Sequence, residues 1–211
     1  DEIWSYIYCK EKNVRHDLRG KGVAGDVWTW TAIDANTKLI ISWHVGNREI
    51  DSGLPFMRDL AKRVINRIQL TTDGLHLYPN VVEEAFGARA DYAYLRKSYG
   101  MEFGNKERRY SAQYIKSITK TIMSGSPDPD HISTSLVERQ NLTMRMSMRR
   151  FTRLSNGFSK KLIYHKYMVA LYFVYYNFCR IHSTIRVTPA MEAGLTNDIL
   201  KIEDLIKLAD N

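Results

Sequence analysis

The order of its apolar segments is the feature that most constrains how this chain can fold. Three short runs rich in aromatic and β-branched residues come first, over residues 3–8, 27–33 and 39–45. Such residues favour extended backbone, so each run is predicted to be a strand. The segment 34–38, between the second and third runs, is rich in turn-forming residues, which indicates a hairpin.

Helices and strands then alternate along the chain. Apolar residues at helical or alternating spacing predict a helix, a strand, a helix and a fifth strand over residues 51–65, 68–72, 79–86 and 92–95. Residues 98–130 lose this regularity, and lysines and arginines are interleaved there with tyrosines. Because interleaved cations and aromatic rings favour contact with single-stranded or distorted nucleic acid, we interpret this segment as a basic insertion. A solvated loop is the alternative interpretation.

A long helix is predicted to begin at Ser135 and to continue through Phe151. At about 100° per residue, its apolar side chains form one stripe and several arginines lie on the opposite side. The stripe consists of Val137, Met144, Met148 and Phe151, and the opposite side of Arg139, Met146, Arg150 and Arg153. Glu138 lies at the edge of the stripe, where a carboxylate can face a cleft. The alternative interpretation is a capping box, in which Glu138 closes back on the amide of Ser135.

A second long helix is predicted over residues 159–180. Its apolar and aromatic residues occur on several sides, so we expect it to be largely buried against the sheet or a partner subunit. Residues 189–211 add a short helical segment and an amphipathic tail. The chain is therefore divided into a core of residues 1–154 and a helical C-terminal extension, residues 155–211, packed on the core.

Three carboxylates fall at the ends of these elements. Asp1 stands at the head of the first strand, Asp73 at the end of the fourth strand, and Glu138 at the start of the long helix. This arrangement resembles the ribonuclease-H-like, retroviral-integrase-type fold, an α/β fold with a mixed five-stranded sheet flanked by helices. Strands one and four are neighbours in that fold, so the three carboxylates are expected to converge. Converging carboxylates repel one another unless divalent cations neutralise them, which predicts a site with oxygen ligands for hard cations.

The segments around these carboxylates carry a more specific resemblance. They are residues 1–6, residues 72–78 and residues 137–142, and the match continues over residues 158–161, 176–182 and 188–190. Together these segments resemble the DDE transposases of the bacterial insertion sequence one family. Other carboxylates compete as ligands, but none has both the motif and the position: Glu2, Asp26, Asp34, Glu83 and Glu84.

The resemblance implies a two-step reaction on DNA. Water first attacks a phosphodiester to free a 3′-OH at the end of the element, and this 3′-OH then attacks target DNA. Two Mg²⁺ ions, with Mn²⁺ as a substitute, would be held by Asp1, Asp73 and Glu138, with Asp1 bridging the ions. The candidates for supporting the ligands or for packing are Asn141, Tyr176, Arg180 and His182.

The charge of the chain fits a polyanionic partner. Thirty-one Lys and Arg residues against 23 Asp and Glu residues give a formal net charge of +8. The residues expected to contact DNA lie in the long helix and in the insertion: Arg139, Arg145, Arg149, Arg150, Arg153, Arg108, Arg109 and Lys116. Several copies of the chain are expected to act together on DNA.

The cysteines and the hydropathy indicate the compartment. Cys9 and Cys179 are too few for a disulfide framework, and no apolar run is long enough to span a bilayer. These observations predict a protein of the bacterial cytoplasm, associated with the nucleoid and not with a membrane. The first residue is Asp, which indicates a domain cut from a longer protein and separated from an N-terminal module that recognises the element's ends.

Two other functions fit the same motifs. One is a nuclease of the same fold that cleaves DNA without strand transfer. The other is a domesticated DNA-binding protein that has no catalytic activity. The presence of all three carboxylates argues against the second.

Overall fold

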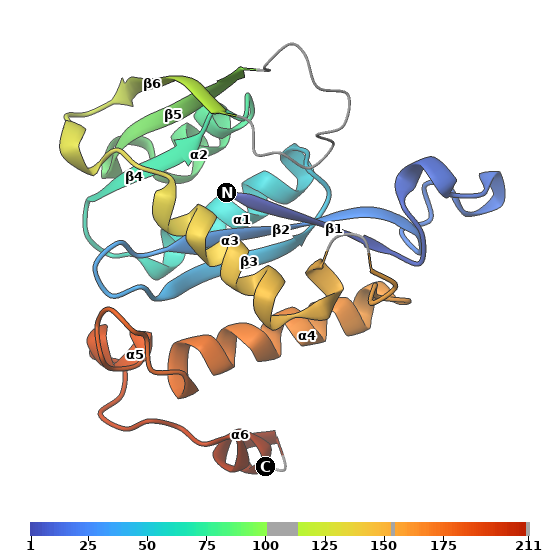
Figure 1. The fold of residues 1–211 in the computed structure, drawn as a ribbon. Coiled ribbons are helices and arrows are strands. Elements are labelled where there is room, and N and C mark those ends of the chain that lie inside the picture. Colours follow the sequence, from blue (N-terminus) through green and yellow to red (C-terminus); the bar gives the residue numbers. More distant parts are fainter. Residues whose placement is uncertain (101–113, 153–154, 210–211) are drawn as a thin grey trace.

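The computed structural model describes residues 1–100, 114–152 and 155–209, which contain two three-stranded sheets and several helices (Figure 1). The first sheet is an antiparallel meander of β1 (Glu2–Ile7), β2 (Gly25–Ile33) and β3 (Ile40–Gly46). The three predicted strands and the hairpin between the last two are therefore confirmed. Asp34 stabilises the hairpin turn, because its carboxylate accepts hydrogen bonds from the amide and the hydroxyl of Thr37 at 2.8 and 2.6 Å.

The second sheet consists of β4 (Ile68–Asp73), β5 (Ala90–Gly100) and β6 (Tyr114–Ser124). β4 and β5 are parallel, whereas β5 and β6 are antiparallel. The interpretation of residues 98–130 as an irregular insertion is wrong for its described part, which contains the end of β5 and all of β6. Nearly all side chains of β6 are exposed, so this strand lacks the alternation that marks a half-buried strand.

The strand pairing differs from the predicted five-stranded sheet. β1 pairs with β2 and β4 pairs with β5, and no ladder joins β1 to β4 in the described residues. The mixed α/β class is confirmed. The two sheets share one hydrophobic core, in which Trp30 of β2 and Tyr92 of β5 are buried with α1 (Ile50–Arg63) and α2 (Tyr78–Phe86).

A second core lies on the first sheet, beneath α3 (Ser135–Ser147) and α4 (Leu162–Val174). The prediction that the helix from Ser135 continues through Phe151 is wrong. It ends at Ser147, because Met148 is extended (φ −122°, ψ 112°) and a short 3₁₀ turn, Arg149–Phe151, follows. Met148 and Phe151 are still buried, so the apolar residues predicted for one side of the helix remain in the core. The arginines after Ser147 no longer continue the predicted basic side of the helix.

The predicted second long helix corresponds to α4 and a π-helical turn, Tyr175–Cys179. One side of α4 is buried in the second core, whereas Tyr164, Tyr167 and Leu171 on its other side are exposed. The expectation that this helix is largely buried therefore holds for one side only.

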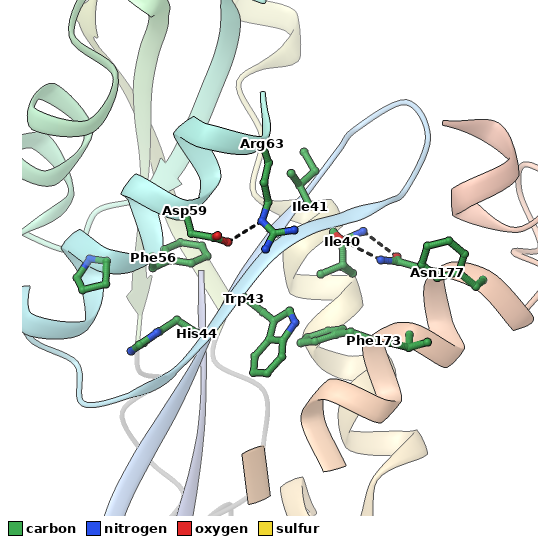
Figure 2. A pocket seen from close by; sticks show the side chains of 12 residues that line it. Ile40, Ile41, Trp43, His44, Phe56, Asp59, Arg63, Phe173 and Asn177 are labelled. Carbon is green, nitrogen blue, oxygen red and sulfur yellow. Dashed lines mark hydrogen bonds and ion pairs between the residues drawn. The ribbon is translucent and has the colours of Figure 1, made fainter. Parts of the chain in front are cut away.

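Asn177, in the π-helical turn, fixes the C-terminal part of the chain to the first sheet. Its side-chain amide donates to the carbonyl of Ile40 and accepts from the amide of Ile40, both at 3.0 Å (Figure 2). Asn177 thus replaces a neighbouring strand at this point of β3, which lies at the edge of its sheet.

The remaining elements are short. Helices α5 (Pro189–Glu192) and α6 (Ile202–Ala209) follow the π-helical turn, and 3₁₀ turns occupy Glu11–Asn13, His16–Leu18, Gly87–Arg89 and Pro129–His131. No helix in the described parts of the chain is both long and apolar enough to cross a membrane.

Candidate metal and DNA site

The ends of β1 and β4 bring together three carboxylates. Asp1 directly precedes β1, Glu2 is its first residue, and Asp73 is the last residue of β4. One carboxylate oxygen from each of them lies within 4.8 Å of the others. Each sheet therefore contributes to one acidic cluster, even though no backbone ladder joins β1 to β4. The structure brings Asp1 and Asp73 together, and it adds Glu2, which the sequence analysis ranked only as a rival.

Glu2 has the most restricted environment of the three. Its carboxylate is fully buried, the hydroxyl of Tyr78 donates to one oxygen, and Nε of Arg48 donates to the other at 3.1 Å. Burial and the neighbouring charge of Glu2 raise the pKa of Tyr78 well above its usual value, so the phenol remains a donor. Both oxygens of Glu2 are therefore engaged by the protein itself.

Arg48 connects the carboxylates of the two sheets. In addition to Glu2, its guanidinium reaches Asp73, with Nη2 3.8 Å from Oδ2, and its centre lies 4.6 Å from the centroid of the Trp28 ring. The cation and the ring attract each other, so the guanidinium is held from three directions. Arg48 is not among the residues that the sequence indicates, because no local motif marks a residue in the turn after β3 as a partner of Asp73.

Glu138 lines the same cleft but lies outside the 4.8 Å group. Together with Asp1 and Asp73 it borders a hollow of about 550 Å³. Its carboxylate accepts from Nζ of Lys97 at 2.5 and 2.6 Å and from the hydroxyl of Thr134 at 2.7 Å. The N-cap of α3 is Thr134 and not Ser135, so the capping box between Ser135 and Glu138, the alternative interpretation of Glu138, is not the arrangement found.

Asn141 lies one helical turn after Glu138 and supports Asp1 directly. Its Nδ2 donates to Oδ2 of Asp1 at 2.9 Å, and the residue is only 8% exposed. The other amide atom, Oδ1, is buried, and nothing in the described residues donates to it. An oxygen without a donor beside two carboxylates fits a hard cation, which binds oxygen ligands of these types. Asp1 and Asp73, with Asn141 beside them, are therefore the residues that could hold such an ion.

Cations surround this cluster. Arg48, Arg96 and Lys97 line the 550 Å³ hollow, and Arg145 lines an adjoining hollow of about 490 Å³ together with Asp1 and Glu138. In the 550 Å³ hollow, three carboxylates therefore lie beside three cationic side chains of the described residues. These cationic side chains could contact a phosphate backbone next to ligands for a hard cation.

The other predicted DNA contacts are dispersed. Arg139 and Arg149 are exposed on and just after α3, and Lys116 is exposed on β6. Arg150 is half-buried and donates to the hydroxyl of Ser159 at 2.9 Å, so its guanidinium is engaged inside the molecule. Three further residues lie outside the described residues: Arg108, Arg109 and Arg153.

Tyr176, Arg180 and His182 do not line either hollow. Tyr176 is buried in the second core, where burial raises its pKa to about 12, and its ring lies 6.3 Å from the ring of His182. Partial burial and the charges of Lys38 and Arg180 lower the pKa of His182. These residues are placed for packing and not for supporting the carboxylates.

Most of the rival carboxylates have local partners. Asp26 accepts from the amide of Glu11 at 3.1 Å, Asp34 belongs to the hairpin turn, and Glu84 pairs with Arg58 across α1 and α2. Glu83 is exposed on α2. None of these rivals belongs to the acidic cluster.

Another hollow, of about 440 Å³, lies between α1, β3 and the C-terminal end of α4 (Figure 2). Asp59 is the only carboxylate among the described residues that line it, and hydrogen bonds from Arg63 and Ser42 hold its pKa below the usual value despite its burial. Burial lowers the pKa of His44 on the opposite wall, with a contribution from the charge of Lys166. A single carboxylate paired with an arginine is not a cation site, which leaves the cleft around Asp1 and Asp73 as the candidate functional site.

A comparison of the chain with known protein families, characterised proteins and solved structures gives no match. The functional inference therefore depends on the chemistry of the cleft and on the sequence motifs around its carboxylates.

Proposed function

We propose that this chain is the catalytic part of a DDE transposase with a ribonuclease-H-like core, which cleaves and joins DNA with the help of divalent cations. One observation carries the proposal. Asp1 and Asp73, which lie at the ends of strands in two different sheets, meet in a cleft that Glu138 and three cationic side chains also line. Each of the three carboxylate-bearing segments that resemble the transposase family, residues 1–6, 72–78 and 137–142, thus contributes a carboxylate to one cleft.

The surroundings of Asp1 support a function in catalysis over a function in stability alone, whereas Asp73 contacts Arg48 and Glu138 contacts Lys97. A cluster formed only for stability is expected to pair each acid with a base, as Glu2 does with Arg48. Asp1 instead has amide partners, from the backbone of Glu2 and the side chain of Asn141, at 2.8 and 2.9 Å. Its carboxylate therefore keeps its negative charge available for a cation.

Bound cations would supply Lewis acidity and an activated oxygen nucleophile beside Asp1 and Asp73. The chain's own residues position the reactants. Asn141 orients Asp1 by its hydrogen bond, and Arg48 restrains Asp73. Arg96 and Arg145, on the walls of the adjoining hollows, would bind phosphates on either side of the reacting bond.

Both steps exchange one phosphorus–oxygen bond for another. In the first, the oxygen of water bonds to phosphorus and the 3′ oxygen leaves with a proton. In the second, the oxygen of that 3′-OH bonds to a phosphorus of the target and loses its proton, and the target's 3′ oxygen leaves with a proton. The number of phosphodiester bonds is unchanged in the second step, so joining needs no external energy source.

The first test replaces Asp73 with Asn. We expect Asp73→Asn to abolish Mg²⁺- or Mn²⁺-dependent cleavage, while DNA affinity persists or improves because a carboxylate without metal repels phosphate. The measurement is nicking and joining of DNA that flanks the coding sequence, with Glu83→Gln, an exposed carboxylate on α2, as the matched control.

The outcomes separate the alternatives. Unchanged cleavage by Asp73→Asn would falsify the proposed mechanism. Cleavage without joining by the unaltered chain would indicate the nuclease. DNA binding without either reaction would indicate a non-catalytic DNA-binding protein.

A further inference from the structure

Lys97 is the positively charged residue that forms an ion pair with Glu138. It lies on β5, two residues after Leu95, which is opposite Asp73 in the parallel pairing of β4 with β5. Its ammonium contacts both oxygens of Glu138 at 2.5 and 2.6 Å, and its side chain is 15% exposed. A largely buried ammonium thus contacts both of the oxygens that Glu138 would need to offer to a divalent cation.

The two cations that neutralise acids of the cleft are held very differently. Arg48 is fixed by a buried carboxylate, by Asp73 and by the ring of Trp28. Lys97 is bound to Glu138, whose side chain is 45% exposed and therefore well solvated. Its flexible stem also lets the ammonium move without a change in the backbone. Of these two cations, Lys97 is the one that can leave its carboxylate at little cost.

We propose that Lys97 is a built-in counterion of Glu138, which leaves the carboxylate when a divalent cation binds and then holds a phosphate of the DNA in the cleft. This inference rests on the proposed function. Lys97 and a cation compete for the same two oxygens, so Glu138 joins the other carboxylates only after Lys97 has moved. The displaced ammonium remains on the wall of the cleft, where a phosphate is the natural partner for a compact positive charge.

The first measurement is the affinity for Mn²⁺ without DNA, by calorimetry. Lys97→Met keeps the apolar stem but removes the competing charge, so its Mn²⁺ affinity should rise by roughly two- to fivefold, the size expected for a partly exposed ion pair. The matched control is Lys62→Met, which removes the same charge from an exposed position on α1. Its Mn²⁺ affinity should equal that of the unaltered chain.

The second measurement distinguishes a phosphate contact from a structural tie. In the presence of Mn²⁺, Lys97→Met should reduce the slope of log affinity for duplex DNA against log salt concentration by about 0.9, which is the contribution of one phosphate contact. Without Mn²⁺ the slope should not change, because Lys97 is then bound to Glu138. Lys97→Gln serves as a second variant, and circular dichroism establishes that each variant is folded.

The results separate this inference from the proposed function. The proposed role of Lys97 is wrong if Lys97→Met binds Mn²⁺ no more tightly than the unaltered chain does. It is also wrong if, in the presence of Mn²⁺, Lys97→Met and the unaltered chain have the same salt slope of DNA binding. If Mn²⁺ binds the unaltered chain and Asp73→Asn equally weakly, the proposed function itself fails.

Discussion

His165 is a fully buried histidine whose ring lies between two serine hydroxyls. Nδ1 lies 2.8 Å from the hydroxyl of Ser159, and Nε2 lies 3.3 Å from that of Ser5. Arg150 donates to Ser159, and Ser5 donates to the carbonyl of Val27. Only one assignment of donors and acceptors satisfies all of these hydrogen bonds: the hydroxyl of Ser159 donates to Nδ1, and Nε2–H donates to the hydroxyl of Ser5. The neutral ring is therefore required, because a proton on Nδ1 would displace the hydrogen of Ser159.

This requirement predicts a pH-dependent stability. Burial lowers the pKa of His165 from 6.5 to about 4, with a contribution from the charge of Arg150. The unfolded chain thus binds a proton that the folded chain does not, so stability is complete above about pH 6.5 and falls as the pH drops toward 4. The loss should approach about 3 kcal/mol, at 1.4 kcal/mol per pH unit. Urea unfolding of the unaltered chain and of His165→Asn checks this, and an equal pH dependence of both proteins between pH 4 and 6.5 would contradict it.

At the scale of the elements, α3 ends at Ser147, and the arginines before and after this end therefore have different surroundings. Arg145 lines the hollow beside Asp1, whereas Arg150, after the break, is turned toward Ser159. We therefore expect Arg145→Gln to reduce the salt slope of DNA binding by about 0.9 and Arg150→Gln to leave it unchanged. Salt titrations of DNA affinity test both variants. If the two slopes decrease equally, the basic residues act as a diffuse field and not through the cleft.

The elements were predictable where local chemistry decides them. The apolar runs of β1 to β4 and the helical spacing of apolar residues in α1 and α2 were sufficient to predict these elements, because each has side chains that pack in the interior. β6 was missed, since a strand exposed on both faces has no such pattern. The end of α3 was missed because Met148 and Phe151 fit a buried helical stripe, and nothing local shows that the backbone becomes extended.

The candidate site was predictable only in part. Motifs indicated Asp1, Asp73 and Glu138, and the structure places all three around one cleft. Arg48 and Lys97 were not indicated, because their partners lie 46 and 41 residues away in the sequence. An ion pair between distant segments leaves no local spacing to recognise.

At the scale of the whole molecule, the acidic cluster lies where the two sheets meet. A cation bound by Asp1 and Asp73 would therefore connect β1 with β4 and stabilise the folded chain. At a Mn²⁺ concentration of 100 times Kd, the gain should be about 2.7 kcal/mol, and Asp73→Asn should gain far less. Thermal unfolding with and without Mn²⁺ measures this difference. An equal rise in Tm for both proteins would mean that the ion binds elsewhere.

The hydrogen bonds that complete the first sheet and the cleft join segments that are far apart in the sequence. Ile40 and Asn177 are 137 positions apart, Asp1 and Asn141 are 140 apart, and Ser5 and His165 are 160 apart. Contacts of such high sequence separation form late, because the entropy of closing a long loop is lost before the contacts compensate for it. During synthesis, β1 to β3 must therefore wait for residues near the C-terminus before their core closes. The carboxylate of Asp1 acquires its Asn141 partner only after a further 140 residues have been made, so the polypeptide emerging from the ribosome before then has no assembled cleft with which to engage DNA.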